Sequence, residues 1–361
     1  MWHRFHAVTL WNFVPSGGME INMKITMMNV AQKANVSIAT VARVVSGNGY
    51  VSESVKSSVQ EVIDQLGYVA SKNLSSKKKF KEGVIGLVVP HSSSNMFFQM
   101  LSTSVNEAAR SKGFQVLTIN SGEDISEIPY LVDSLIKKNV DGIIFSSFIQ
   151  DKVPDDIREY MDNLNKAVVM IERPAEYFGV DKVLVNNTEG TFDATNYLIG
   201  KGHTEITYIG KKQVFNVEKE RYSGYLMAME KNQLEVYAKT HSYFAQDYSF
   251  ECGYQIAQKL FEQERPTALM VAADILAVGV LQYMYEKGIR IPEDVSVVGH
   301  DDTISQYLSP ALTSVSLPIE DMAMEAVEML IGRKNNIYHN ARCISISPRI
   351  IERNSVKSLH K

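Results

Sequence analysis

The sequence has few of the residues from which disulfide frameworks and metal sites are built. Its two cysteines, Cys252 and Cys343, stand far apart and lack the spacing of metal ligands. This argues against a zinc site or a disulfide framework and is typical of a protein in a reducing cytosol. There is no run of about 18 apolar residues, so the sequence predicts no membrane-spanning helix. A nucleophile elbow, a phosphate-binding glycine loop and a metal-spaced set of histidines are also missing. We therefore expect neither an enzyme nor a bound metal or cofactor.

The charges that are present divide unevenly along the 361 residues. The formal net charge is −4, but residues 23–81 contain nine Lys or Arg and three Asp or Glu, whereas residues 82–361 contain 27 and 37. A small basic segment on a large acidic remainder predicts that the segment contacts a polyanion. The length itself predicts more than one domain, because single hydrophobic cores stop growing at roughly 250–300 residues.

Residues 28–52 have the spacing of two short helices joined by a tight turn. Ala31 is small enough for a close helix–helix approach, and Asn35 tolerates the left-handed backbone that such a turn often needs. Ser37 is a good N-cap for the second helix, and Val41 begins the apolar inner face of that helix. This spacing is typical of the helix-turn-helix motif, whose second helix enters the major groove of DNA. The alternative is an ordinary helical hairpin in some other core.

A resemblance to a known family starts in the same segment, in the run SIATVARVVSGNGYVSESVKSSVQEVIDQLGY. LacI-family transcription regulators share several elements of this segment. They are the VS-x-x-TV run that starts at Val36, then Arg43 and Gly47, the Val-Ser pair at residues 51–52 that starts the next helix, and the LGY run at residues 66–68. Ala42 is a departure, because the family has a serine there. The similarity extends over residues 23 to about 355. It implies a DNA-binding head, a hinge, and a body that dimerises and binds an effector.

The first turns of the helix that begins at Ser37 are expected to contact DNA. Ile38 and Ala39 are apolar and could touch a thymine methyl group, and Arg43 could bond a guanine or reach a phosphate. The alternatives are that Ile38 packs against the third helix and that Arg43 is merely solvated. Because one head reads only a few base pairs, we expect a homodimer on a pseudo-palindromic operator in double-stranded DNA. The predicted phosphate contacts are Ser37, Thr40, Asn48 and Tyr50.

The hinge departs from the family pattern at two positions. In the family this segment becomes a helix on the operator and wedges a leucine into the minor groove. Here Ala70 replaces the usual proline and Lys77 stands in the place of the leucine, although Leu74 could serve in a register shifted by three residues. DNA bending is therefore a weaker expectation than DNA binding.

From residue 83 onward, apolar runs of strand length alternate with amphipathic helices, and residues 236–241 are among the expected strands. Near-continuous apolar strands separated by helices predict a parallel sheet covered on both faces. Two successive sets of them predict an α/β body with two doubly wound lobes, which resembles periplasmic binding proteins, behind an all-α head. The expected segments are a non-native or disordered extension (1–22), the helix-turn-helix domain (23–69), a hinge linker (70–82) and an effector-binding and dimerisation domain (83–361).

The resemblance places the effector contacts at the carboxyl ends of the strands. Arg221, in an ER-x-x-GY run, matches a ligand-binding arginine, and Asp301 is retained, so the two are expected to form a polar pair; a purely structural ion pair is the alternative. Three usual sugar contacts are altered, at His91, Ala273 and His300. The predicted effector contacts are His91, Ser93, Phe98, Arg221, Asp274 and Asp301.

Together these features predict a cytoplasmic, sequence-specific DNA-binding regulator, with repression as the family default. Its operator affinity would change when a small metabolite, such as a sugar, binds between the lobes. The altered contacts leave open a changed ligand class or a loss of small-molecule sensing. The alternative is control by a protein co-effector, as in catabolite-control relatives, although Ile304 stands where those proteins have a basic residue. A secreted solute-binding protein would need an export signal in place of the basic head.

Overall fold

The chain divides into two compact units, Met1–Lys79 and Phe80–Lys361, which are described separately. None of the helices in the described ranges is long and apolar enough to span a bilayer. The predicted extension (1–22) and the predicted hinge (70–82) lie outside the described residues. The computed structural model describes residues 26–47, 49–66, 68, 83–91, 96–122, 124–146, 153–172, 179–212, 216–333 and 340–360.

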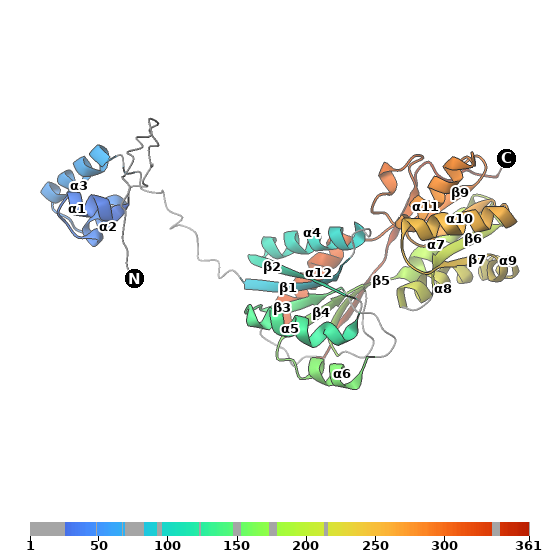
Figure 1. The fold of residues 1–361 in the computed structure, drawn as a ribbon, viewed down its shortest axis with the longest axis horizontal. Helices are drawn as coiled ribbons and strands as arrows, with labels where there is room; N and C mark the ends of the chain where they lie inside the picture. The colour runs from blue at the N-terminus through green and yellow to red at the C-terminus, as the bar shows by residue number, and fades with distance from the viewer. Residues whose placement is uncertain are drawn as a thin grey trace, which may run out of the picture. The chain divides into compact units, whose positions relative to one another are not determined.

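The described part of the first unit is helical, as the sequence predicts (Figure 1). The turn before the second helix uses Asn35 at φ 50°, and the Ser37 hydroxyl then accepts a hydrogen bond from the Thr40 N–H at 3.1 Å. Gly47, at φ 68°, ends the helix in the left-handed conformation that glycine adopts without strain. Ala31 and Val41 are buried in the small core, as expected. The helices are α1 (Met27–Lys33), α2 (Ile38–Ser46) and α3 (Glu53–Leu66).

The second unit contains two six-stranded sheets, one in each lobe, with helices on both faces (Figure 1). The first sheet has the order β11-β5-β4-β3-β1-β2 and is parallel throughout. Its strands are β1 (Gly83–Pro90), β2 (Phe114–Ser121), β3 (Gly142–Phe145), β4 (Ala167–Ile171), β5 (Asp181–Val185) and β11 (Cys343–Ile346). Its helices are α4 (Met96–Ser111), α5 (Ile128–Lys137), α6 (Asp155–Asp162) and α12 (Ile319–Arg333), with a 3₁₀ turn at Ile125–Glu127.

The second sheet has the order β12-β10-β9-β8-β6-β7, and its edge strand β12 runs antiparallel to β10. This strand is the one departure from the expected parallel arrangement. The strands are β6 (Ile206–Lys211), β7 (Ser242–Ala245), β8 (Ala268–Val271), β9 (Ser296–Asp301), β10 (Thr313–Ser316) and β12 (Arg349–Ile351). The helices are α7 (Asn187–Gly200), α8 (Asn216–Lys231), α9 (Glu235–Thr240), α10 (Phe250–Gln263) and α11 (Asp274–Glu286), with a 3₁₀ turn at Ser305–Tyr307.

The prediction of a strand at residues 236–241 is wrong. Helix α9 covers residues 235–240, and the strand follows as β7. The β-favouring Val236 and Tyr237 suggested a strand, but Val236 is exposed and Ala238 is the buried residue of the helix. Packing of that one small side chain against α8 and β6 therefore outweighs local propensity.

The continuous apolar runs of the strands follow from burial on both faces of each sheet. In β1, Ile85 and Leu87 pack in the cluster that includes α4 and α12, whereas Val88, the residue after Leu87, packs with α5 on the opposite face. Successive side chains of a strand point to opposite faces, so a doubly covered strand needs an apolar residue at each position.

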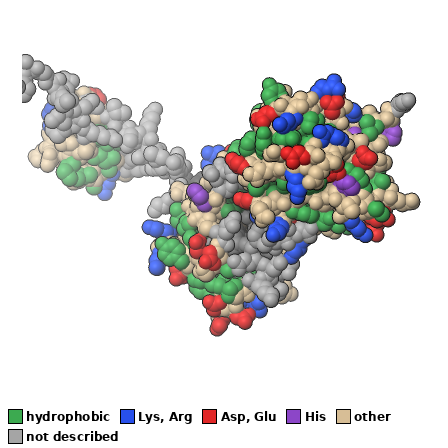
Figure 2. All heavy atoms as spheres, turned by 45° about the vertical axis from the view of Figure 1, so that its right-hand side comes forward, with side chains coloured by type: hydrophobic (Ala, Val, Ile, Leu, Met, Phe, Trp, Pro, Cys, Tyr) green, Lys and Arg blue, Asp and Glu red, His purple; other side chains and the backbone are tan. Residues whose placement is uncertain are grey.

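The surface of the body has charges of both signs. On the face of the body drawn in Figure 2, Lys and Arg side chains are interspersed with Asp and Glu side chains.

The chain passes between the lobes three times within the described residues. It leaves the first sheet after β5 to enter α7, returns from β10 to α12, and leaves again from β11 to β12. Asp181, at the start of β5, is fully buried and accepts two hydrogen bonds of 2.7 Å from Arg333, at the end of α12. The Arg342 N–H also donates to it at 2.7 Å. This carboxylate therefore ties the end of α12 to the start of β5.

We expect Asp181→Ala to destabilise the body strongly, because it leaves the buried Arg333 guanidinium without its carboxylate. Breaking a buried pair by removing one partner costs about 3–5 kcal/mol. The urea concentration at the midpoint of unfolding reports the change. The control is Asp155→Ala, which removes an exposed carboxylate 3.6 Å from Arg158 and should change stability by less than about 1 kcal/mol. Equal effects of the two substitutions would contradict the assignment.

Candidate DNA-binding and effector-binding sites

Helix α2 presents its first turn to solvent. Ile38 is 47% exposed and Ala39 is exposed, so both side chains are open to solvent in this structure. Ser37 and Thr40 hydroxyls lie 2.9 Å apart beside them. The exposed Arg43 lies one turn further along the helix.

Tyr50, a further predicted DNA contact, follows the end of α2. The Arg43 side chain lies beside Gly49. Tyr50 is 93% exposed. The apolar side chains of α2 can contact a thymine methyl group, and Arg43 can donate to a guanine or a phosphate. The nearby hydroxyl groups can bond phosphates of the same DNA. The predicted contacts Asn48, Leu74 and Lys77 lie outside the described residues.

The body contains a buried cluster around Arg221 of α8, which is only 4% exposed. Its Nε donates to the Asn187 side-chain oxygen at 3.0 Å, and its Nη1 donates to the Ala272 carbonyl at 2.6 Å. Its Nη2 lies 2.9 Å from Asp301 Oδ1, which is the pair that the sequence predicts. Burial acts to lower the pKa of Arg221, but the Asp301 carboxylate overcomes this effect and raises it, so the guanidinium stays charged.

Glu172 brings the first lobe into this cluster. It follows β4, has φ 61° and is 5% exposed. Its Oε1 lies 3.9 Å from Arg221 Nη2 and accepts a hydrogen bond from the Asn187 amide at 3.3 Å. Burial raises the pKa of Glu172 to about 7. Sequence reasoning missed this residue, although its position directly after a buried strand is where ligand-binding residues of such sheets lie.

The end of β9 is held in an unusual backbone conformation. Asp301 and Asp302 have φ of 100° and 56°, and residues held in such sparsely populated regions cluster at ligand sites. His300 is completely buried, and its Nδ1 lies 3.3 Å from Asp301 Oδ1. Burial lowers the pKa of His300 to about 4, so the ring is neutral at pH 7. Asp302 is paired with Arg353 at 2.7 Å.

The carboxylate of Asp274 is held by donors from the loop after Asp301 and from β10. Its carboxylate accepts hydrogen bonds from the Thr303 N–H at 2.8 Å and from the hydroxyls of Ser305 and Ser314 at 2.8 and 2.9 Å. Both oxygens are therefore occupied by protein donors, and the side chain supports the loop after Asp301. Its predicted effector contact stays a prediction.

Two further predicted effector residues, Phe98 and His91, make no polar contact with the Arg221 cluster within the described residues. Phe98 is buried in the core of the first lobe, where its ring meets Phe97 edge-on. His91 is exposed after β1, and no hydrogen bond or ion pair between described residues links it to Arg221. Ser93 lies outside the described residues.

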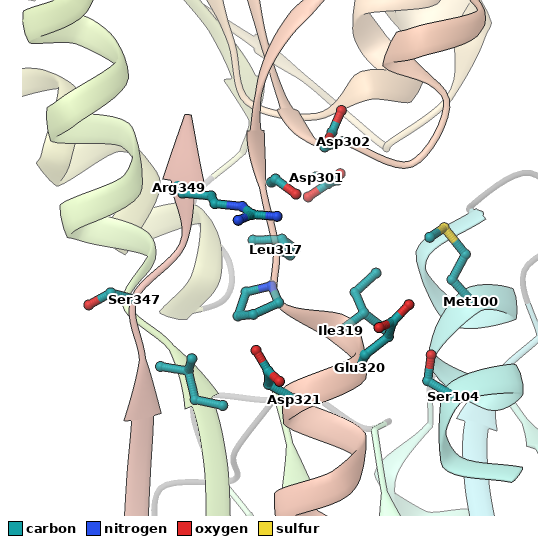
Figure 3. Close-up of a pocket in the computed structure, with 13 residues that line it drawn as sticks. Met100, Ser104, Asp301, Asp302, Leu317, Ile319, Glu320, Asp321, Ser347 and Arg349 are labelled. Atoms are coloured by element: carbon teal, nitrogen blue, oxygen red, sulfur yellow. The ribbon is translucent and has the colours of Figure 1, made fainter. Parts of the chain in front are cut away.

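A pocket of about 400 Å³ opens between the lobes next to Asp301 (Figure 3). Asp301, Asp302 and Arg349 line it from the second lobe, and Glu320 and Asp321 line it from the first turn of α12. Asp301 therefore contributes both to the Arg221 cluster and to this pocket. Among the residues that the structure describes, no group of three or more His, Cys, Asp or Glu is placed to hold a metal ion.

The buried Asp274 gives an expectation for the pH dependence of stability. Burial raises its pKa in the folded protein to about 7, from an ordinary value of 3.8. The folded state thus keeps a proton that the unfolded chain releases, so the free energy of unfolding falls as the pH rises from about 4 through about 7. Asp274→Asn cannot ionise, so we expect its urea midpoint to fall less than that of the wild type between about pH 5 and about pH 8. The same fall in both proteins would exclude this contribution.

Comparisons with known proteins agree with this architecture. The profile of bacterial regulatory proteins of the lacI family matches residues 26–71, and that of periplasmic binding protein-like domains matches residues 195–356. The HTH-type transcriptional repressor PurR of Vibrio cholerae is 33% identical over 341 residues, covering 93% of this chain and 99% of that protein. Catabolite control protein A of Priestia megaterium is 30% identical over 346 residues, covering 93% and 100%.

A solved structure extends the similarity to the folded chain. The complex of the transcriptional regulator CelR with cellobiose superposes with a TM-score of 0.67 at 27% identity, covering 92% of this chain and 99% of that one. A relative of at least 30% identity that matches nearly the whole chain settles the family, and with it the prediction of a regulator rather than an enzyme. The chain belongs to the lacI family of bacterial regulatory proteins and is a DNA-binding transcription regulator.

Proposed function

We propose that this regulator binds a pseudo-palindromic operator as a homodimer in the cytoplasm and represses transcription. We also propose that a small molecule bound beside Arg221 changes its affinity for the operator. The observation that carries the second proposal is the Arg221 cluster itself, in which groups from both lobes meet around one buried guanidinium. The similarity to a repressor, and to a regulator solved with cellobiose, supports both proposals.

In the head, the exposed first turn of α2 supports direct contacts from Ile38, Ala39 and Arg43 to base edges. Ser37, Thr40, Asn48 and Tyr50 are proposed to contact phosphates, and Leu74 and Lys77 to contact the minor groove or its phosphates. Homodimerisation is typical of the family, and two heads would read the two half-sites of the operator.

In the body, the proposed mechanism is a shift between two arrangements of the lobes. Glu172 stands on the first lobe, whereas Arg221 and Asp301 stand on the second. A ligand that contacts both sides binds one lobe arrangement better than the other, and it can shift operator affinity only by that difference. The predicted contacts His91, Ser93, Phe98 and Asp274 would add to this central group.

We expect Arg43→Ala to weaken operator binding about 5- to 150-fold, because a bidentate contact to guanine contributes about 1–3 kcal/mol. The measurement is a gel-shift titration on pseudo-palindromic DNA flanking the gene. Gln60→Ala is the matched control, because Gln60 is an exposed residue of α3 hydrogen-bonded within its own helix. A half-site duplex should bind less tightly than the full palindrome. If the wild type, Arg43→Ala and Gln60→Ala bind the full site with equal affinity, the assignment of Arg43 is wrong.

We expect Arg221→Ala to abolish the response of operator binding to small molecules. The variant removes the guanidinium that holds Asp301 and Asn187 in place. The same gel shift, repeated with sugars, amino sugars and nucleosides, compares the ligand-induced change in the two proteins. Operator binding of the wild type that is indifferent to every compound would instead favour control by a protein co-effector.

A further inference from the structure

The charge balance around Arg221 is unfavourable for an anionic ligand. Each of the three guanidinium nitrogens already faces a protein acceptor, namely Asn187, the Ala272 carbonyl or Asp301. Two carboxylates, Asp301 and Glu172, stand within 3.9 Å of the one guanidinium, and both are at least nine-tenths buried. A carboxylate or phosphate on the ligand would add a further negative charge to a group that is already shielded from water.

The same cluster contains buried polar atoms that lack hydrogen-bond partners. Within the described residues, Glu172 Oε2, His300 Nε2 and the Tyr248 hydroxyl have none. His300 Nδ1 must carry the ring proton, because it faces the Asp301 carboxylate, so Nε2 presents a lone pair. With Glu172 ionised, two of the three atoms are therefore acceptors, and the Tyr248 hydroxyl can act either way.

Unpaired buried acceptors favour a ligand that is rich in donors. A buried acceptor without a partner is unfavourable, so a ligand that supplies the missing hydrogen gains affinity. Hydroxyl groups could satisfy these acceptors but would leave the excess of negative charge. An ammonium group supplies donors and also neutralises that excess.

On the basis of the function proposed above, we infer that the effector is an amino sugar whose protonated amine binds Glu172. The amine donates to the free Oε2 of Glu172, while ring hydroxyls face Asp301, His300 and Tyr248. Glu172 stands on the first lobe and the other three stand on the second. The amine and the ring thus contact opposite lobes, and the ligand links the two.

The test is calorimetric titration of the full-length protein with matched pairs of ligands. The pairs are D-glucose with D-glucosamine, D-galactose with D-galactosamine and D-mannose with D-mannosamine, and the 6-phosphates of the neutral sugars form the anionic arm. We expect at least one amine to bind about tenfold or more tightly than its neutral partner, since a charged hydrogen bond contributes about 1.5–3 kcal/mol. The phosphates should not bind.

Two variants locate the contact. Glu172→Gln keeps the size of the side chain and should lower affinity for the amine about tenfold or more, with affinity for the neutral partner nearly unchanged. Glu320→Gln is the matched control, because it removes a carboxylate of the neighbouring interlobe pocket instead. The comparison of paired ligands on the wild type does not depend on how well either variant folds.

Several results would overturn the inference. These are tighter binding of a neutral or phosphorylated sugar, an amine preference that persists in Glu172→Gln, an amine preference lost in Glu320→Gln, and no binding of any amine. If the gel shift then responds to a compound without an amine, the proposed small-molecule control stands and only the ligand class fails. If neither assay responds to any compound, both proposals fail together.

Discussion

The buried guanidinium of Arg221 is the interaction on which the effector-binding half of this protein depends. A charge so far from water is tolerated only when acceptors surround it, and here they come from separate elements. Asn187 starts the first helix after the chain enters the second lobe, Ala272 directly follows β8, and Asp301 ends β9. The need to satisfy one cation thus fixes the relative positions of three strand or helix ends. Glu172 extends this dependence to the other lobe.

This arrangement also explains why the sheets end as they do. The chain turns sharply at Asp301 and Asp302 through backbone conformations that side chains usually avoid. Asp274 holds the following loop through Thr303 and Ser305, and the ion pair of Asp302 with Arg353 fixes it from the other side. Strain at the site is therefore offset by hydrogen bonds just behind it. The supporting residues are as important for the geometry as the residues that face the ligand.

Local features of the fold were predictable from the sequence, and distant partners were not. The cap at Ser37, the turn at Asn35 and the two sets of apolar strands depend on neighbouring residues, so their patterns are readable. Arg221 and Asp301 could be paired only because the family resemblance marks both. Glu172 and the donors to Asp274 could not be found in this way, because their contacts join residues far apart in the sequence. The helix at residues 235–240 was missed because one buried alanine outweighed its β-favouring neighbours.

The three crossings between the lobes have a consequence for the order in which the protein can fold during synthesis. The first sheet begins at residue 83, but one of its faces is covered in part by α12 and its edge is completed by β11, which ends at residue 346. A ribosome therefore releases nearly the whole second lobe before the first lobe can close its core. Until then, Leu87, Val169 and their neighbours lack part of their apolar covering. The nascent first lobe should be the part that most needs a chaperone, although it is made before the second.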